Sequence, residues 1–481
     1  MTVKRFGVFL VCLLVAQILL SSSYQAKAQA VAQPDVFVGI DVAYENLDDI
    51  KQLVDEVSGY TNLFVIGCSG ITRNITRTDE LSQYLHDRGL YTVAYLDYPP
   101  SSQWLDRARG WGDRFLGFYA YDEPGGRQLD QAEGYMAVLS AADANDAAAQ
   151  FITATNGYIR ADNRYAFAHN FADPSEFQLF CGDYALYWFD YKAGFDTMWA
   201  EFGWNYSRQL NVALCRGAAT VQNKDWGVII AWTYTVPPYI ESGAELYADL
   251  VYAYESGAKY IVLFDSNEEY TEGILQQEHL DALKQFWQYI QSHPRTAASS
   301  GDRTAFVLPL NYAFGFRGPD DKIWGLWEAN DFSYELSRNV NGMLELYGDK
   351  LDLVYDDGLQ GNNGYSQLIY WNDPSFQPEP LFPPTPPPMP TPTATAAPTP
   401  TPTSTSTPTP SSTSSPTLSP TQLSTQSPPA SPPQTSPPST EPSAGLPLPI
   451  EFMYVAIATL TVAAVVGVGV AFWRRSRRSR G

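Results

Sequence analysis

Short runs of β-branched and aromatic residues alternate with helical patterns from residue 36 to residue 294, and this alternation constrains the fold most. The eight strand-like runs are VFVGIDV (36–42), TNLFVIG (61–67), YTVAYLDY (91–98), FLGFYAYDE (115–123), QFITATN (150–156), YALYWFDY (184–191), WGVIIAWTY (226–234) and KYIVLFDS (259–266). Apolar residues recur at helical spacing between them, as at Ile50, Val54 and Val57. Eight strand–helix units in roughly 250 residues predict a (β/α)₈ TIM barrel, an α/β fold, over residues 31–298.

A doubly wound open sheet is the alternative arrangement of alternating strands and helices. That fold usually carries a glycine-rich phosphate loop after its first strand, and GIDVAYENL is not such a loop. Residues 299–375 contain further strand-like runs and one helical pattern, SYELSRNVNGMLELYG. They predict a small C-terminal α/β appendage packed on the barrel.

Both ends of the chain have the composition of membrane-targeting segments. Residues 1–30 read as a secretory signal peptide with an apolar core and small residues at its end. Residues 376–449, rich in Pro, Thr and Ser, predict a disordered stalk. Residues 450–473 are long and apolar enough for one transmembrane helix, and the basic tail at 474–481 is expected in the cytoplasm. The sequence therefore predicts a single-pass type I protein of the cell membrane with its bulk extracellular.

Charge and cysteine content limit the partners and cofactors. A net charge of −22 repels phosphate backbones and argues against nucleic-acid binding. The four histidines lie far apart without metal-binding spacing, so neither a metal nor another cofactor is expected. If Cys181 and Cys215 both lie at the bottom of the barrel, they form a candidate disulfide in an oxidising compartment.

Acidic residues gather where the predicted strands end. They are Asp41, Asp97, Asp122, Glu123, Asp190 and Asp265. Acids are otherwise depleted in strands, and barrel active sites form at the carboxyl ends of the strands. Helix capping explains some acids, but Glu123 is a poor cap because Pro124 holds it extended. The sequence therefore predicts one mouth that collects several carboxyl groups.

Asp122 and Glu123 are adjacent at the end of the fourth predicted strand. Side chains alternate along a strand, so these two are expected to point to opposite sides. If Glu123 faces the barrel axis, Tyr119 and Tyr121 do so as well. Desolvation above these rings would raise the pKa of Glu123.

The acid followed by Glu-Pro at the end of strand four resembles the (β/α)₈ glycoside hydrolase superfamily. Many members carry Asn-Glu-Pro there, which implies Glu123 as the general acid/base. The usual second glutamate at the end of strand seven is absent from AWTYTVPPY. Glycoside hydrolysis usually needs two carboxylates, so Asp265 or Asp190 is the expected catalytic partner. The signal, stalk, anchor and arginine tail together resemble archaeal surface proteins.

Aromatic residues near the strand ends support a carbohydrate ligand, because sugar rings stack on aromatic faces. The candidate substrate-binding residues are Asp41, Asp97, Asp122, Tyr121, Trp188, Tyr191, Trp232 and Tyr234. Core packing is the other explanation for the tyrosines and tryptophans. Two hypotheses follow: a membrane-anchored glycoside hydrolase-like protein acting on an extracellular glycan, or a catalytically inactive barrel that binds glycans or builds the cell envelope.

Overall fold

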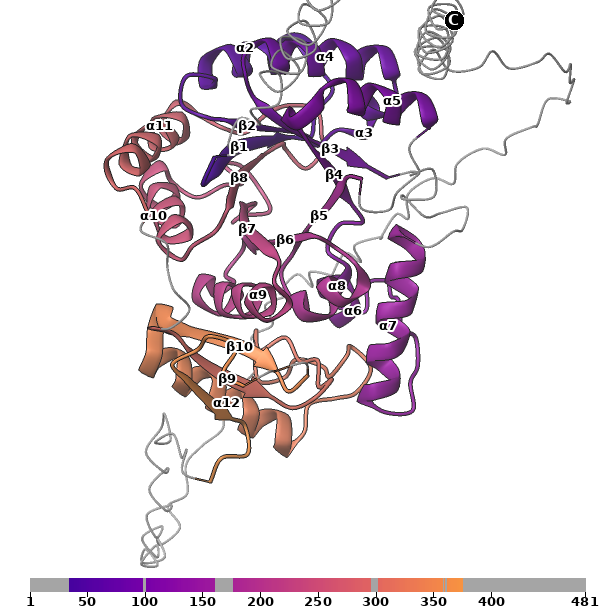
Figure 1. Ribbon diagram of the computed structural model, residues 1–481, viewed down its shortest axis with the longest axis vertical. Coiled ribbons are helices and arrows are strands. Elements are labelled where there is room, and N and C mark those ends of the chain that lie inside the picture. The colour runs from indigo at the N-terminus through magenta and orange to yellow at the C-terminus, as the bar shows by residue number, and fades with distance from the viewer. Residues whose placement is uncertain are drawn as a thin grey trace, which may run out of the picture. The chain divides into compact units, whose positions relative to one another are not determined.

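Eight parallel strands close into a barrel in chain order, and helices surround it (Figure 1). The computed structural model describes residues 34–97, 101–160, 176–295, 302–357, 359 and 361–374. The strands are β1 (Phe37–Val42), β2 (Leu63–Ile66), β3 (Tyr91–Leu96), β4 (Phe115–Ala120), β5 (Gln178–Asp183), β6 (Thr197–Phe202), β7 (Asp225–Ile230) and β8 (Tyr260–Asp265). Because β1 pairs with β8, the sheet has no open edge. The predicted (β/α)₈ barrel is confirmed.

Several of the barrel helices begin at residues whose side chains cap free backbone N–H groups. The barrel helices are α2 (Leu47–Val57), α3 (Ser69–Thr72), α4 (Ile75–Asp87), α5 (Ser102–Gly110), α6 (Pro124–Leu129), α7 (Ala144–Ile159), α8 (Tyr187–Ala193), α9 (Arg208–Gln222), α10 (Gly243–Glu255) and α11 (Gln277–Ser292). Asn46 caps α2, Asn74 caps α4 and Ser207 caps α9 through their side-chain oxygens. In α10, Ser242 and Glu245 form a capping box.

Large side chains fill the inside of the barrel beneath its mouth. Trp199 and Phe37 are completely buried there, and the ring of Phe37 stacks on that of Tyr260 with centroids 4.9 Å apart. Trp199 pairs in register with Gly227, where a Cβ would lie 2.7 Å from the indole. The glycine thus leaves space for the tryptophan side chain. The interior of the barrel is filled by side chains, and a site can form only above them, at the mouth.

One predicted strand, QFITATN at 150–156, lies inside helix α7. Asp143 caps this helix by accepting from two backbone N–H groups. Phe151, Thr155 and Ile159 repeat at four-residue intervals and are all buried on one face. Helical spacing and a strong cap outweigh the local β propensity of the Ile-Thr pair. The strand that enters the barrel here is β5.

The predicted strand YALYWFDY at 184–191 falls mostly in helix α8. Six of the seven residues of α8 are buried, so the helix has no polar face. A short apolar run of this kind does not distinguish a buried helix from a buried strand. The true sixth strand is β6, which sequence analysis did not assign.

The appendage is a three-stranded parallel sheet with the order β10-β9-β11. Its elements are β9 (Thr304–Leu308), α12 (Asp331–Tyr347), β10 (Leu351–Tyr355) and β11 (Gln367–Tyr370). The guanidinium of Arg216 on α9 donates to Asp352 on β10 at 2.7 Å, and both side chains are almost fully buried. This ion pair ties the appendage to the barrel, as the sequence predicts for a packed α/β unit.

The predicted signal peptide, stalk, transmembrane helix and basic tail lie outside the described residues. Within the part of the chain that the structure describes, none of the helices combines the length and apolar character needed to cross a membrane.

Candidate active site

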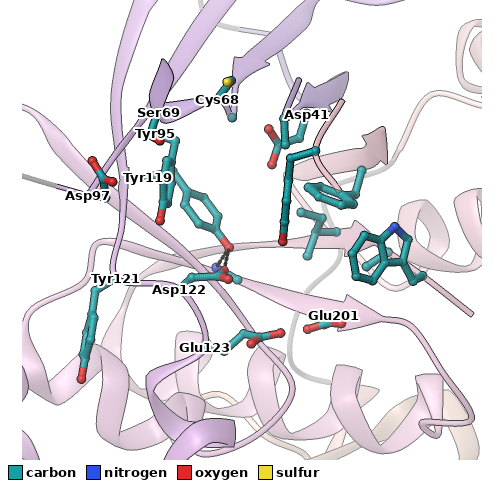
Figure 2. A pocket seen from close by; sticks show the side chains of 18 of the residues that line it. Asp41, Cys68, Ser69, Tyr95, Asp97, Tyr119, Tyr121, Asp122, Glu123 and Glu201 are labelled. Atoms are coloured by element: carbon teal, nitrogen blue, oxygen red, sulfur yellow. Dashed lines mark hydrogen bonds between the residues drawn. The ribbon is translucent and has the colours of Figure 1, made fainter. Parts of the chain in front are cut away.

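A cleft of about 1500 Å³ opens at the carboxyl ends of the barrel strands. The predicted site residues that line it are Asp41, Asp97, Tyr121, Asp122, Glu123 and Trp232. Figure 2 shows the first five of these around one shared space, together with Glu201 from β6. The structure therefore brings acids from β1, β3, β4 and β6 to one mouth.

Asp122 and Glu123 both face the cleft, so the expectation that they point to opposite sides is wrong. Strand β4 ends at Ala120, and the regular alternation of side chains ends with it. Tyr121 and Glu123 then adopt left-handed backbone conformations, with φ of 55° and 53°. Such conformations are costly for residues other than glycine and tend to mark functional sites.

The carboxylate of Asp183 at the end of β5 holds this turn in place. It accepts from the backbone N–H groups of Gly125 at 2.6 Å and Gly126 at 2.9 Å, which begin helix α6. It also accepts from the N–H groups of Tyr184 at 2.7 Å and Ala185 at 3.0 Å. One buried carboxylate thus joins the exits of β4 and β5.

The two glycines after Pro124 are required by close packing against the segment that follows β5. A Cβ at residue 126 would lie 2.1 Å from the ring of Tyr184. A Cβ at residue 125 would lie 2.6 Å from the Cβ of Leu186. These contacts explain the Gly-Gly pair after Asp-Glu-Pro, because a larger residue would push α6 away from Asp183.

Asp122 is held by two partners. The hydroxyl of Tyr119 accepts from the N–H of Gly182 at 2.9 Å and donates to Oδ1 of Asp122 at 2.5 Å, as dashed lines show in Figure 2. Arg127 donates to Oδ2 of Asp122 and to Oε2 of Glu123, both at 3.2 Å. The guanidinium therefore fixes the two neighbouring carboxyl groups relative to each other.

The carboxyl groups of Glu123 and Glu201 point toward each other in the cleft (Figure 2), so that one of them, once protonated, can donate a hydrogen bond to the other. Burial and the charge of Asp122 raise the pKa of Glu123 to about 7, although Arg127 opposes the shift. Burial raises the pKa of Glu201 well above its usual value, and the charge of Glu123 raises it further. A hydrogen bond between two carboxyl groups requires a shared proton.

Sequence analysis missed Glu201 because it placed the sixth strand at 184–191. The alternation in TMWAEF was the available signal. Met198, Ala200 and Phe202 pack outward against the helices, while Trp199 and Glu201 point inward. A single acid on the inner side of an otherwise apolar strand is a candidate site residue.

Asp265, an expected catalytic partner, does not line the cleft. Its Oδ1 accepts from the N–H groups of Ile274 at 2.6 Å and Leu275 at 3.0 Å, and its Oδ2 accepts from the hydroxyl of Tyr44 at 3.4 Å. The carboxylate therefore fixes the segment that follows β8. The structure thus bonds the oxygens of Asp265 to this backbone outside the cleft lining, and its role as the catalytic partner of Glu123 stays a prediction.

Asp190, the other expected partner, lies inside α8 and is fully buried away from the cleft. Its carboxyl group contacts that of Asp183, and burial raises its pKa well above the usual value. Trp188 on the same helix packs against Tyr355 of the appendage. Tyr191 donates to the carbonyl of Asp225 at 2.7 Å. None of these three predicted site residues on α8 is among the residues that line the cleft.

Two further expectations are corrected. Tyr234 is exposed and does not line the cleft. Cys181 and Cys215 are free thiols, so the candidate disulfide is not formed. Cys181 lies within β5 and contacts the carbonyl of Tyr121, whereas Cys215 on α9 contacts that of Met198. The expected pairing depended on placing Cys181 before the sixth strand rather than in the fifth.

The carboxyl groups of the cleft do not form a metal-binding arrangement. No group of three or more His, Cys, Asp or Glu side chains in the described part of the chain is placed to hold a metal ion. Asp97, at the rim, forms an ion pair with Arg73. The site therefore offers proton transfer and hydrogen bonding through its own side chains.

Comparison with protein-family models and with curated proteins finds no match to this chain. Among solved structures, the β-galactosidase of the psychrophilic Marinomonas ef1 covers 70% of this chain and 72% of its own, with 10% identity and a TM-score of 0.45. The β-galactosidase of the Antarctic haloarchaeon Halorubrum lacusprofundi covers 70% and 69%, also with 10% identity and a TM-score of 0.45. A 3-keto-L-gulonate-6-phosphate decarboxylase from Vibrio cholerae covers 53% and 98%, with 12% identity and a TM-score of 0.27. Likeness at this level carries no argument about function.

We expect Asp183→Ala to lower the free energy of unfolding by about 3 kcal/mol or more, because it leaves four backbone N–H groups without their acceptor. Asp143→Ala is the matched control, since Asp143 accepts from two N–H groups at the start of α7. That cap is exposed, and its loss should cost only about 1 kcal/mol. Urea denaturation checks both values, and equal losses would contradict the structural role of Asp183.

Stability should fall as the pH rises toward 7 and above. The pKa of Glu123 is raised from 4.5 to about 7 in the folded chain, so its contribution is complete below pH 4.5 and lost through pH 7. Glu123→Gln carries no titrating carboxyl group and should flatten this decline, by at most about 3 kcal/mol. Thermal unfolding from pH 5 to pH 8 measures this pH dependence of stability, with Glu335→Gln on α12 as the exposed control. Parallel curves for wild type and Glu123→Gln would refute the shifted pKa.

Proposed function

We propose that the protein is a glycoside hydrolase-like enzyme that acts on a glycan by carboxylate acid/base chemistry. The observation that carries this proposal is the cluster of three carboxyl groups, those of Asp122, Glu123 and Glu201, in one open cleft. A general acid works best with a pKa near the working pH. Glu123, with a pKa of about 7, meets that requirement.

The roles of the neighbouring side chains follow from their contacts. Glu123 donates its proton to the glycosidic oxygen as the bond to the leaving group breaks, and the water that adds to the anomeric carbon passes a proton to Asp122. Asp122 is held by Tyr119 and Arg127 and presents negative charge to the sugar ring as positive charge develops on it. Glu201 shares the proton with Glu123 before the sugar binds.

Aromatic side chains of the cleft support a sugar ligand. Trp232 lines the cleft beside Trp204, with ring centroids 6.4 Å apart. On another part of the wall, the rings of Tyr121 and Tyr158 lie 4.4 Å apart. Flat apolar faces of this kind suit the apolar faces of sugar rings, while the carboxyl groups accept from sugar hydroxyls.

A catalytically inactive glycan-binding barrel is the second candidate function. The observation that favours it is the close approach of the Glu123 and Glu201 carboxyl groups, which point toward each other in Figure 2. Hydrolases place their two carboxyl groups about 5 Å apart for retention or ~6.5–9.5 Å apart for inversion. Two carboxyl groups in contact leave no room for a sugar or a water between them. Catalysis would require the ligand to separate them.

We propose that the chain is held at the cell membrane by residues 450–473, with the barrel outside the cell. The support is the order of signal peptide, Pro/Thr/Ser-rich stalk, apolar segment and arginine tail in the sequence. This arrangement would bring the cleft to extracellular glycans.

Turnover of glycans by the full-length chain tests the enzymatic proposal. We expect Glu123→Gln to lower kcat about 10²–10⁴-fold on any glycan that wild type hydrolyses, with binding retained. Glu201→Gln should shift the pH profile, and kcat/KM of wild type should fall as the pH rises through about 7. Glu335→Gln on α12 should leave turnover unchanged. Retained binding without turnover by wild type would favour the inactive barrel instead.

Membrane fractionation of cells that express the full chain tests the location. We expect the protein in the membrane fraction, with the barrel digested by protease added outside intact cells. A chain that ends at residue 449 lacks the apolar segment and should be released into the medium. Full-length protein in the soluble cell fraction would contradict the proposed anchor.

A further inference from the structure

The cleft is lined by more acidic than basic side chains. Among the described residues that line it, seven have carboxyl groups and two have guanidinium groups. The acids are Asp41, Glu45, Asp97, Asp122, Glu123, Glu201 and Glu269, and the bases are Arg77 and Arg127. Such a lining attracts positive charge and repels anionic ligands.

Both guanidinium groups already have carboxylate partners. Arg77 pairs with Glu45 at 3.0 Å. Arg127 is shared between Asp122 and Glu123. Neither cation of the lining therefore remains to neutralise Asp41 or Glu201.

Asp41 is the carboxyl group with the greatest need of a partner. Its side chain points into the cleft in Figure 2, yet the residue is only 5% exposed. Its Oδ1 has no hydrogen-bond partner among the described residues. Buried polar atoms without partners are rare in folded proteins and call for an explanation.

The absence of a side chain at Gly67 leaves space for the carboxyl group of Asp41. A Cβ at residue 67 would lie 2.0 Å from Oδ1 of Asp41, so only glycine allows the carboxyl group to sit there. Burial raises the pKa of Asp41 well above its usual value, and the charges of Asp122 and Asp265 raise it further. A donor brought by a ligand, above all a cationic one, would remove this penalty.

A bound metal ion does not account for the excess charge, since no three potential ligands converge in the described residues. The positive charge is then expected to be distributed along the ligand. The cleft volume of about 1500 Å³ exceeds that of a pocket for one drug-sized ligand, about 300–1000 Å³. Its aromatic pairs, Trp204–Trp232 and Tyr121–Tyr158, provide separate places for sugar rings.

We propose that the glycan is an oligosaccharide of amino sugars with free amines, and that Asp41 accepts a hydrogen bond from one ligand ammonium group. This inference rests on the proposed function and names its substrate class. It excludes glycans built of uronic acids or sulfated sugars, because their charge has the same sign as the cleft.

Calorimetric titration of the full-length chain compares matched oligosaccharides. The probes are hexasaccharides of glucosamine and of galactosamine, their N-acetylated forms, the corresponding neutral glucose and galactose oligomers, and a galacturonate hexasaccharide. We expect the amine form of at least one backbone to bind about tenfold or more tightly than its neutral counterpart, and no binding of the uronate. Raising NaCl from about 0.05 M to about 0.5 M should weaken amine binding and leave neutral binding unchanged.

Asp41→Asn should reduce the preference for amine over neutral sugar about tenfold, because it removes the charge but keeps the shape. The control is Asp113→Asn, which removes one charge from the exposed turn before β4 and should leave the preference unchanged. If Asp41→Asn does not fold, the inference is tested by the preference of wild type for amine over neutral sugars and by the salt dependence of amine binding.

The outcomes separate this inference from the proposed function. The inference is overturned if a neutral sugar, an acetylated sugar or the uronate binds as tightly as the amine form or more tightly. If such a sugar is nevertheless hydrolysed and Glu123→Gln abolishes its turnover, the proposed function stands. No binding of any probe overturns the inference, and no turnover of any glycan overturns the enzymatic function.

Discussion

The carboxylate of Asp183 receives four backbone N–H groups from two separate segments, the start of α6 and the turn after β5. A backbone hydrogen bond from the N–H of Glu123 to the carbonyl of Gly182, at 3.0 Å, also links the exits of β4 and β5. The carboxylate of Asp183 fixes helix α6 immediately after Pro124, so that the chain must turn sharply between Ala120 and that proline. The left-handed conformations of Tyr121 and Glu123 are the local cost of this turn.

That turn changes the chemistry available at the mouth of the barrel. A strand that continued regularly would send Asp122 and Glu123 to opposite sides. The turn places both in the cleft, where Arg127 bridges them and Glu201 from β6 contacts Glu123. Burial raises the pKa of Glu123, and the charge of Asp122 raises it further. The site is therefore a product of backbone geometry as much as of residue identity.

The barrel and Glu123 were predictable from the sequence, because β-branched runs ending in an acid follow a regular order. The fifth and sixth strands were not, since residues 184–191 are buried on all sides as a helix and lack a diagnostic period. This one error made Asp190 a candidate and concealed Glu201. Asp265 is a different case: strand-end position does not reveal that its oxygens bind backbone N–H groups.

The central claim is that the fold brings Glu123 and Glu201 together around one proton. A crystal structure of the ligand-free protein at atomic resolution, at pH 6, tests it most directly. The claim predicts carboxyl oxygens of the two residues about 2.5–3.0 Å apart, with unequal C–O bonds in one carboxyl group that mark its proton. Carboxyl groups separated by about 5 Å or more, each with equal C–O bonds, would contradict the claim.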